Sequence, residues 1–294
     1  MFYRRKVILA LLQSFNGNLE KIRLQKLLFL FTSQQTKADY DFVPYKYGCF
    51  SYSATADMNA MSRKGFLEDG HTFFRRLDTT DYVVQLKPDD QIRLREIKFQ
   101  FGSMNKDSLM KYTYHHYPFY AIHSEVAEKI LTPIELQKVT FARPNSTDTI
   151  LFTIGYEGIS LEEYLVRLLK NNVQVLVDVR NNPLSMKYGF SKSHLKKYCE
   201  SLGIQYIHIP EVGIPSSQRQ ELSTQKDYDD LFTEYRNTNL PSAATSQQNI
   251  LQLLIQHHRI ALTCFEANIH QCHRKHLAEA IQKLPGFHYD IQHI

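Results

Sequence analysis

The sequence predicts an α/β protein with two domains: a mostly helical, winged-helix-like N-terminal domain and a C-terminal βαβ domain with a mainly parallel sheet. Two observations predict this class. Apolar residues recur at helical spacing through most of the first half, whereas short apolar runs alternate with amphipathic segments in the second half. A polar stretch lies between the halves, so we expect domains at residues 1–132 and 149–294 and a linker at residues 133–148.

Length and composition narrow the class of protein. The chain has 294 residues, of which 43% are hydrophobic, and this suits one large or two ordinary domains. No apolar run approaches the roughly 20 residues that a membrane helix needs, and the basic N-terminus lacks the pattern of a signal peptide. Four cysteines are too few for a disulfide framework, so we expect a cytoplasmic protein with no membrane partner.

The net charge of +5 is unevenly distributed. Residues 1–148 contain 21 Lys and Arg against 16 Asp and Glu, whereas residues 149–294 contain 14 of each. The excess positive charge in the N-terminal half is expected of a module that binds DNA or RNA. An ordinary basic domain would show the same imbalance.

The first elements of the chain follow the order of a winged helix-turn-helix. Apolar spacing predicts helices at residues 4–13, 20–34 and 51–64. Turn residues and alternating apolar positions predict a β-hairpin from residues 72–77 and 82–86.

The basic residues of this module are candidates for nucleic-acid contact. The third helix, which a winged helix presents to a groove, ends in Arg63 and Lys64. The wing carries Arg75 and Arg76, which could contact phosphates. The alternative is a winged-helix fold used to contact a protein partner.

The N-terminal segments Leu24-Gln-Lys-Leu-Leu-Phe-Leu30, Phe42-Val-Pro-Tyr-Lys-Tyr-Gly48 and Gly65-Phe-Leu67 carry a family pattern. They resemble the YwgA-type and Panacea-related helical domains of bacteria, over residues 5–130. The resemblance implies an antitoxin or a small regulatory partner and carries over no catalytic residue.

Three further helices are predicted at residues 89–101, 106–112 and 122–131. An aromatic cluster lies between the last two, and it suits either stacked bases or a hydrophobic seam between helices, which we favour. Its members are Tyr112, Tyr114, Tyr117, Phe119 and Tyr120.

The second half predicts a parallel sheet. Apolar runs at residues 150–154, 173–177, 204–209 and 260–263 alternate with helical segments, which is typical of βαβ units. Right-handed crossovers bring the carboxyl ends of such strands to one edge, where open α/β sheets bind ligands. Polar residues follow all four strands, so we expect a functional site there; they are Tyr156, Glu157, Asp178, Arg180, His208, Glu211, Cys264, Glu266, His270, Cys272, His273 and Arg274.

Carboxylate chemistry is the favoured reaction at this edge. Glu157, Asp178 and Glu266 could activate water, while Arg180 and Arg274 hold a phosphate. This set suits hydrolysis of a glycosidic or phosphodiester bond in a nucleotide. A flipped or modified base would be recognised in such a pocket. Structural ion pairs, Asp178–Arg180 or Glu266–Arg274, are the alternative. Further substrate-binding candidates are Tyr156, Ser185, Glu211, Cys264, Cys272 and His273.

Two other chemistries are weaker. Cys264, His270, Cys272 and His276 are residue types that bind zinc, but their spacing is not that of a usual zinc knuckle, so no metal or cofactor is expected. A rhodanese- or phosphatase-type cysteine loop needs an arginine six positions after Cys264, where this chain has His270.

The C-terminal half also carries a family pattern. Its segments are Thr153-Ile-Gly-Tyr156, Leu176-Val-Asp-Val-Arg180 with Pro183 and Ser185, Phe190-Ser191, Gly203-Ile-Gln-Tyr206, Pro210-Glu-Val-Gly213, Leu262-Thr-Cys-Phe-Glu266 and Cys272-His-Arg274. They resemble the domain of unknown function 488 family over residues 150–294. The resemblance implies a small α/β domain in contact with nucleic acid or metal. Many members have His-Ser in place of Tyr156-Glu157, so the chemistry or target differs here if that position contacts substrate.

The sequence therefore predicts a bacterial protein that binds DNA through its N-terminal domain and recognises or hydrolyses a nucleotide, which can be a modified one, at the C-terminal strand ends. Phage defence is one setting for such a protein. The alternative is a non-enzymatic regulator or toxin–antitoxin-type sensor that acts through protein contacts.

Overall fold

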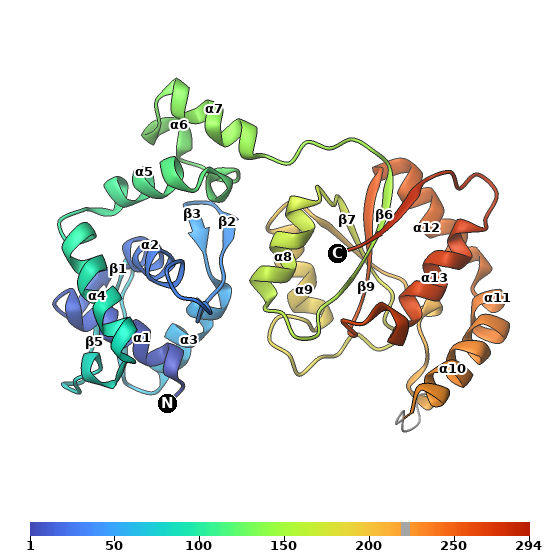
Figure 1. Cartoon of the computed structure of the whole chain (residues 1–294), viewed down its shortest axis with the longest axis horizontal. Coiled ribbons are helices and arrows are strands. Elements are labelled where there is room, and N and C mark those ends of the chain that lie inside the picture. The colour runs from blue at the N-terminus through green and yellow to red at the C-terminus, as the bar shows by residue number, and fades with distance from the viewer. Residues whose placement is uncertain (219–223) are drawn as a thin grey trace. The chain divides into compact units, whose positions relative to one another are not determined.

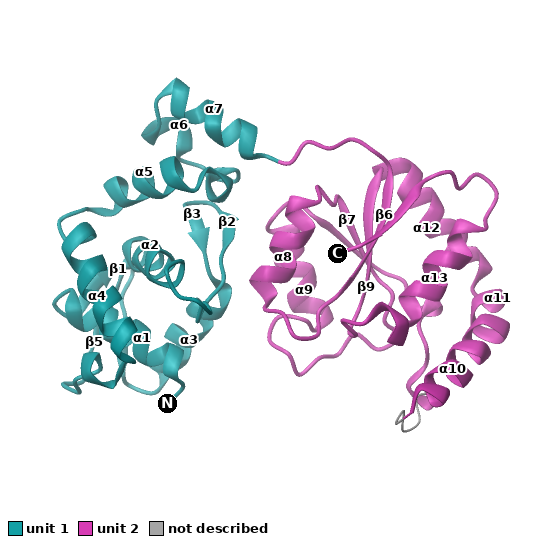
Figure 2. Cartoon of the chain, viewed as in Figure 1, with its two compact units in different colours: residues 1–143 teal, residues 144–294 magenta. Residues whose placement is uncertain are grey.

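The computed structural model describes residues 1–218 and 224–294. The chain divides into two compact units, Met1–Arg143 and Pro144–Ile294 (Figures 1 and 2). Among these described residues, no helix combines the length and the apolar character needed to cross a membrane. The expected class is confirmed, with a mostly helical first unit and a parallel α/β second unit.

The first unit is built around three helices, α1 (Tyr3–Ser14), α2 (Lys21–Thr32) and α3 (Tyr52–Arg63). Their apolar faces form one core, in which the middle of α1 and most of α2 are buried. Strand β1 (Asn18–Glu20) follows α1, and the hairpin of β2 (Val43–Tyr45) and β3 (Gly48–Phe50) precedes α3.

The wing differs from the predicted hairpin. Strand β5 (Phe73–Arg76) pairs with β4 (Leu67–Asp69) on one side and with β1 on the other, whereas Val83–Gln85 is a 3-10 turn. The carboxylate of Asp81 accepts hydrogen bonds from the backbone nitrogens of Val83, at 3.0 Å, and Val84, at 3.4 Å. Such local bonds compete with strand pairing, which explains why residues 82–86 do not form a strand.

The rest of the first unit is helical, with α4 (Pro88–Phe101), α5 (Lys106–His116), α6 (Ala127–Ile130) and α7 (Pro133–Ala142). The predicted helix at residues 122–131 is reduced to α6. Much of the segment predicted as a linker is helix α7, because Thr132 and Glu135 form a capping box and Pro133 occupies the first helical position.

The aromatic cluster of the first unit packs inward. The rings of Tyr117 and Tyr120 lie edge-on against Phe29 of α2, with centroids 4.9 and 4.8 Å away. This is the geometry of aromatic pairs in a core, so these rings form the hydrophobic seam.

The second unit is a five-stranded parallel sheet in the order β10-β6-β9-β7-β8. Helices α8 and α9 lie on one side of it and α12 and α13 on the other (Figure 1). The strands are β6 (Ile150–Gly155), β7 (Val175–Asp178), β8 (Gln205–His208), β9 (Arg259–Cys264) and β10 (Asp290–His293). The helices are α8 (Leu161–Lys170), α9 (Lys192–Glu200), α10 (Gln225–Glu234), α11 (Leu240–Ser242), α12 (Ala244–His257) and α13 (His273–Gln282).

Burial explains which strands were predicted. The central strands β6, β7 and β9 are buried at every position, as expected for parallel strands covered on both faces. The edge strand β10 is mostly exposed and carries polar residues, so it has no apolar run and was missed.

Candidate functional site

The strand register brings the predicted polar residues to one edge of the sheet. At the carboxyl ends, Gly155 of β6 is paired with Cys264 of β9, and Asp178 of β7 is paired with Thr263 on one side and His208 on the other. The three central strand ends are thus aligned, and the loops that follow them meet at this edge.

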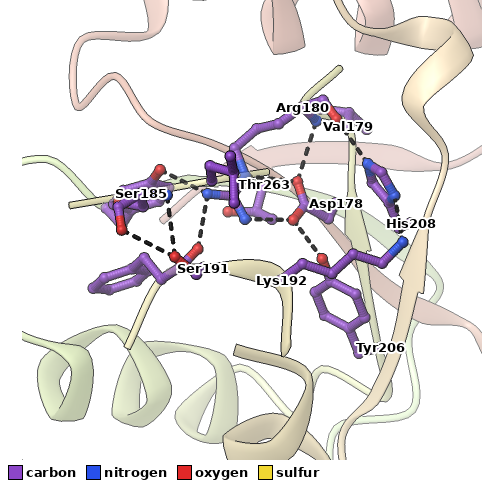
Figure 3. Close-up of polar contacts among 12 residues, drawn as sticks. Asp178, Val179, Arg180, Ser185, Ser191, Lys192, Tyr206, His208 and Thr263 are labelled. Atoms are coloured by element: carbon purple, nitrogen blue, oxygen red, sulfur yellow. Dashed lines mark hydrogen bonds and ion pairs between the residues drawn. The ribbon is translucent and has the colours of Figure 1, made fainter. Parts of the chain in front are cut away.

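Asp178 and Arg180 form a closed, buried ion pair at this edge (Figure 3). Asp178 accepts from the backbone nitrogen of Arg180 at 3.1 Å, from its Nε at 2.8 Å, and from the Tyr206 hydroxyl at 2.5 Å. Arg180 Nη1 donates to the Tyr156 hydroxyl at 2.7 Å and to the Phe190 carbonyl at 2.9 Å. Burial lowers the pKa of Arg180, but hydrogen bonding to Asp178 and its charge outweigh burial and raise it above its ordinary value.

The contacts of this network argue against two predicted roles, the base role of Asp178 and the phosphate-binding role of Arg180. Asp178 is saturated by Arg180 and Tyr206, so it is not a free base, and the Arg180 guanidinium is engaged by protein groups rather than free for a phosphate. His208 extends the network, with Nε2 2.8 Å from the Arg180 carbonyl and Nδ1 3.0 Å from Lys192 Nζ. Because a carbonyl only accepts, Nε2 carries the proton.

Glu157 and Arg274 hold the loop that follows β9. The Glu157 carboxylate accepts from the backbone nitrogen of Ala267 at 3.0 Å. Arg274 donates to the carbonyl oxygens of Glu266 and Ala267. Both side chains therefore position the loop, and neither shows the catalytic or phosphate-binding role predicted for it.

Gly155 lets this loop approach the sheet. A β-carbon on residue 155 would lie only 1.9 Å from the Glu266 carbonyl oxygen. Only glycine leaves the space for that approach, so the sequence of β6 contributes to where Glu266 stands.

Four side chains form what we call the thiol cluster: Cys264, Glu266, Cys272 and His273. One sulfur, nitrogen or oxygen atom of each lies within 4.8 Å of the others. Cys264 Sγ is 3.0 Å from Glu266 Oε2 and 3.5 Å from His273 Nδ1. His273 Nε2 is 3.1 Å from the Val179 carbonyl, so it donates there and leaves Nδ1 facing the sulfur.

Burial and hydrogen-bond partners shift the pKa values of the two thiols of the cluster in opposite directions. Burial alone raises the pKa of Cys264, but hydrogen bonding from Cys272 and the nearby His273 lower it well below its ordinary value. The pKa of Cys272 moves well above its ordinary value, because of burial and its bond to Cys264. The four residue types considered for zinc in the sequence, Cys264, His270, Cys272 and His276, do not come together as a set: His276 contacts Arg236 and Glu279, and His270 is exposed in the loop.

A pocket of about 300 Å³ opens beside the cluster. Four predicted substrate-binding residues line it: Tyr156, Arg180, Ser185 and Cys264. Cys272 and His273 are buried and belong to the cluster rather than to the wall, and Glu211 is exposed on a short 3-10 turn outside the wall. The other lining residues were not among the predicted site residues, and all but Phe265 lie outside the family segments: Asn181, Asn182, Leu184, Met186, Ile214, Ser216 and Phe265.

The predicted nucleic-acid-binding residues fall into two groups. Arg63 and Lys64 are exposed at the end of α3. On the wing, Arg75 pairs with Glu68, and Arg76 bonds to Asp78 and Gln13. The wing arginines are therefore largely neutralised.

A parallel α/β unit with thiols, an imidazole and a carboxylate at its strand ends has the layout of a small-molecule-binding or catalytic domain. Residues 160–281 match a family model described as Domain of unknown function DUF488. This range begins at the N-cap of α8 and contains Asp178, Arg180 and the thiol cluster. No curated protein matches the chain. The match does not reach the first unit, where the YwgA-type resemblance stays a prediction.

Proposed function

We propose that the second unit is a hydrolase that acts on a nucleobase or nucleotide held in the strand-end pocket. The observation that carries this proposal is that the pocket meets Cys264, and so the thiol cluster, at the carboxyl edge of the sheet. A pocket of about 300 Å³ is at the small end of ligand sites and suits a single base or nucleoside.

The walls of the pocket suit a flat heterocycle. Leu184, Met186 and Phe265 are 76%, 104% and 42% exposed, so they give the pocket an apolar rim on which a ring can stack. Asn181 and Asn182 offer amide donors and acceptors beside that rim, and such groups read the edge of a base.

We assign proton transfer to Glu266, which does not line the pocket but whose carboxylate lies 3.0 Å from the sulfur of Cys264, a residue of the pocket wall. Asp178 is saturated and Glu157 holds the loop, whereas Glu266 is half-buried beside Cys264. In the proposed reaction Glu266 takes a proton from water, and the water oxygen bonds to an electrophilic carbon of the substrate. The bond from that carbon to a nitrogen or oxygen atom breaks, and this leaving atom receives the proton.

We also propose that the first unit contacts nucleic acid through Arg63 and Lys64. The exposure of these two cations and the positive charge of the N-terminal half support it. The neutralised wing favours the other candidate, a protein-binding module. Affinity for DNA or RNA that falls steeply with salt, and falls further in Arg63→Ala/Lys64→Ala, supports the first candidate; no affinity at low salt contradicts it.

The hydrolase proposal is tested by incubating the full chain with plain and modified DNA, RNA and free nucleotides, followed by mass spectrometry of released bases and cleaved strands. Glu266→Gln should lower the rate of product formation by about 10²- to 10⁴-fold. Glu211→Gln is the matched control, since it removes an exposed carboxylate at the same edge. A non-enzymatic regulator would give no product with any substrate.

A further inference from the structure

We propose that Cys264, Cys272 and His273 bind one Zn²⁺ ion, with Glu266 at the fourth position directly or through a water molecule. Thiolate, imidazole and carboxylate are the groups zinc takes in proteins, and here one atom of each of the four side chains lies within 4.8 Å of the others. With a water molecule between Glu266 and the ion, the inference deepens the proposed hydrolase by naming what would activate that water. Direct ligation by Glu266 would fill the fourth position and would make the site structural, which would contradict the hydrolase. The binding of metal can be measured independently of any hydrolase activity.

The distances fit a tetrahedral ion. Bond lengths of about 2.0–2.3 Å place the donors of a tetrahedral zinc site roughly 3.3–3.8 Å from one another. Cys264 Sγ lies 3.5 Å from His273 Nδ1 and 3.0 Å from Glu266 Oε2. The four donor atoms lie within 4.8 Å of one another, so shifts of up to about 1 Å, on the order of thermal motion, would bring the whole set to the required spacing.

His273 is already oriented as a metal ligand would be. Zinc-binding histidines usually donate their other ring nitrogen to a carbonyl or carboxylate, which fixes the tautomer. His273 Nε2 does this to the Val179 carbonyl at 3.1 Å. The ring of Tyr235 packs edge-on against the imidazole, with centroids 5.7 Å apart, and fixes its plane.

The charges of the cluster also fit an ion. Two thiolates and one carboxylate around Zn²⁺ leave one negative charge, and the buried Arg274 guanidinium beside the Glu266 backbone offsets it. Without a cation, two thiols and a carboxylate would be gathered at one largely buried point, where charge is costly. A Cys264–His273 nucleophile pair is the competing arrangement, and in it Cys272 would serve only as a hydrogen-bond donor to Cys264.

The first test is the zinc content of the full chain, purified after expression with added zinc and measured by inductively coupled plasma mass spectrometry. Wild type should carry about one zinc ion per chain. Cys272→Ser and His273→Asn should each carry below about a tenth of an ion per chain. Cys199→Ser is the matched control, because it removes a buried cysteine outside the cluster and should retain the ion. Circular dichroism confirms that each variant is folded.

A second test covers variants that fail to fold. Metal-free wild type titrated with Co²⁺ should develop the near-ultraviolet thiolate-to-cobalt charge-transfer band, which added Zn²⁺ abolishes. The proposal is overturned if folded wild type neither contains zinc nor develops this band. It is also overturned if Cys272→Ser retains as much zinc as wild type. If the protein binds zinc but forms no product from any substrate, the hydrolase proposal is refuted and the zinc proposal stands. If the metal-free chain shows full turnover, the ion takes no part in the reaction.

Discussion

Gly155 and Glu266 approach so closely that a β-carbon on residue 155 would lie 1.9 Å from the Glu266 carbonyl oxygen. The contact ties the end of β6 to the loop after β9. Gly155→Ala must displace backbone rather than a flexible side chain, so we expect it to lower the free energy of unfolding by about 1–3 kcal/mol. Urea unfolding and zinc content measure this; an unchanged midpoint and full zinc occupancy would show that the loop is free to move.

The Asp178–Arg180 pair should matter for stability more than for chemistry. Asp178→Asn leaves a buried guanidinium without its carboxylate, and we expect a loss of about 3–5 kcal/mol in the free energy of unfolding. The control is Glu163→Gln, which breaks the exposed Glu163–Arg167 pair and should cost below about 1 kcal/mol. A variant that keeps its stability but loses turnover would instead make Asp178 a catalytic base.

The strand ends were predictable because the position of a ligand site in a parallel sheet follows from topology. The roles of the side chains were not, because they depend on partners far along the chain. Asp178 is saturated partly by Tyr206, which lies 28 residues away, and no local pattern signals that contact. His273, rather than His270 or His276, joins Cys264 because Arg274 and Gly155 set the path of the loop.

The first unit contains a buried lysine that should make its stability depend on pH. Lys26 is buried and donates to the Cys49 carbonyl at 2.9 Å, and burial lowers its pKa below the ordinary value of 10.5. Between these two pKa values the unfolded chain binds more protons than the folded chain, so the free energy of unfolding rises with pH across that window.

Lys26→Met isolates this effect, since it keeps the length of the side chain without the charge. The difference in the free energy of unfolding between wild type and Lys26→Met, from denaturant curves at several pH values, should move in favour of wild type as pH rises towards 10.5. A difference independent of pH would mean that Lys26 stays protonated in the folded protein.

Phe265 should contribute to substrate binding through its exposed ring at the pocket rim. If a base stacks there, Phe265→Ala should raise KM roughly tenfold, since stacking contributes about 1–3 kcal/mol, with kcat little changed. Phe141→Ala, which removes an exposed phenylalanine in the first unit, is the control. Equal KM values for wild type and Phe265→Ala would exclude stacking at this position.

The hydrolase proposal is tested most directly by the rate of product formation by zinc-supplemented wild type and Glu266→Gln, compared at equal zinc content and equal melting temperature. We expect turnover of a nucleobase-containing substrate by wild type and a fall of about 10²- to 10⁴-fold in Glu266→Gln, the range that a general base contributes. Equal rates for the two proteins, or no product from wild type with any such substrate, would contradict it.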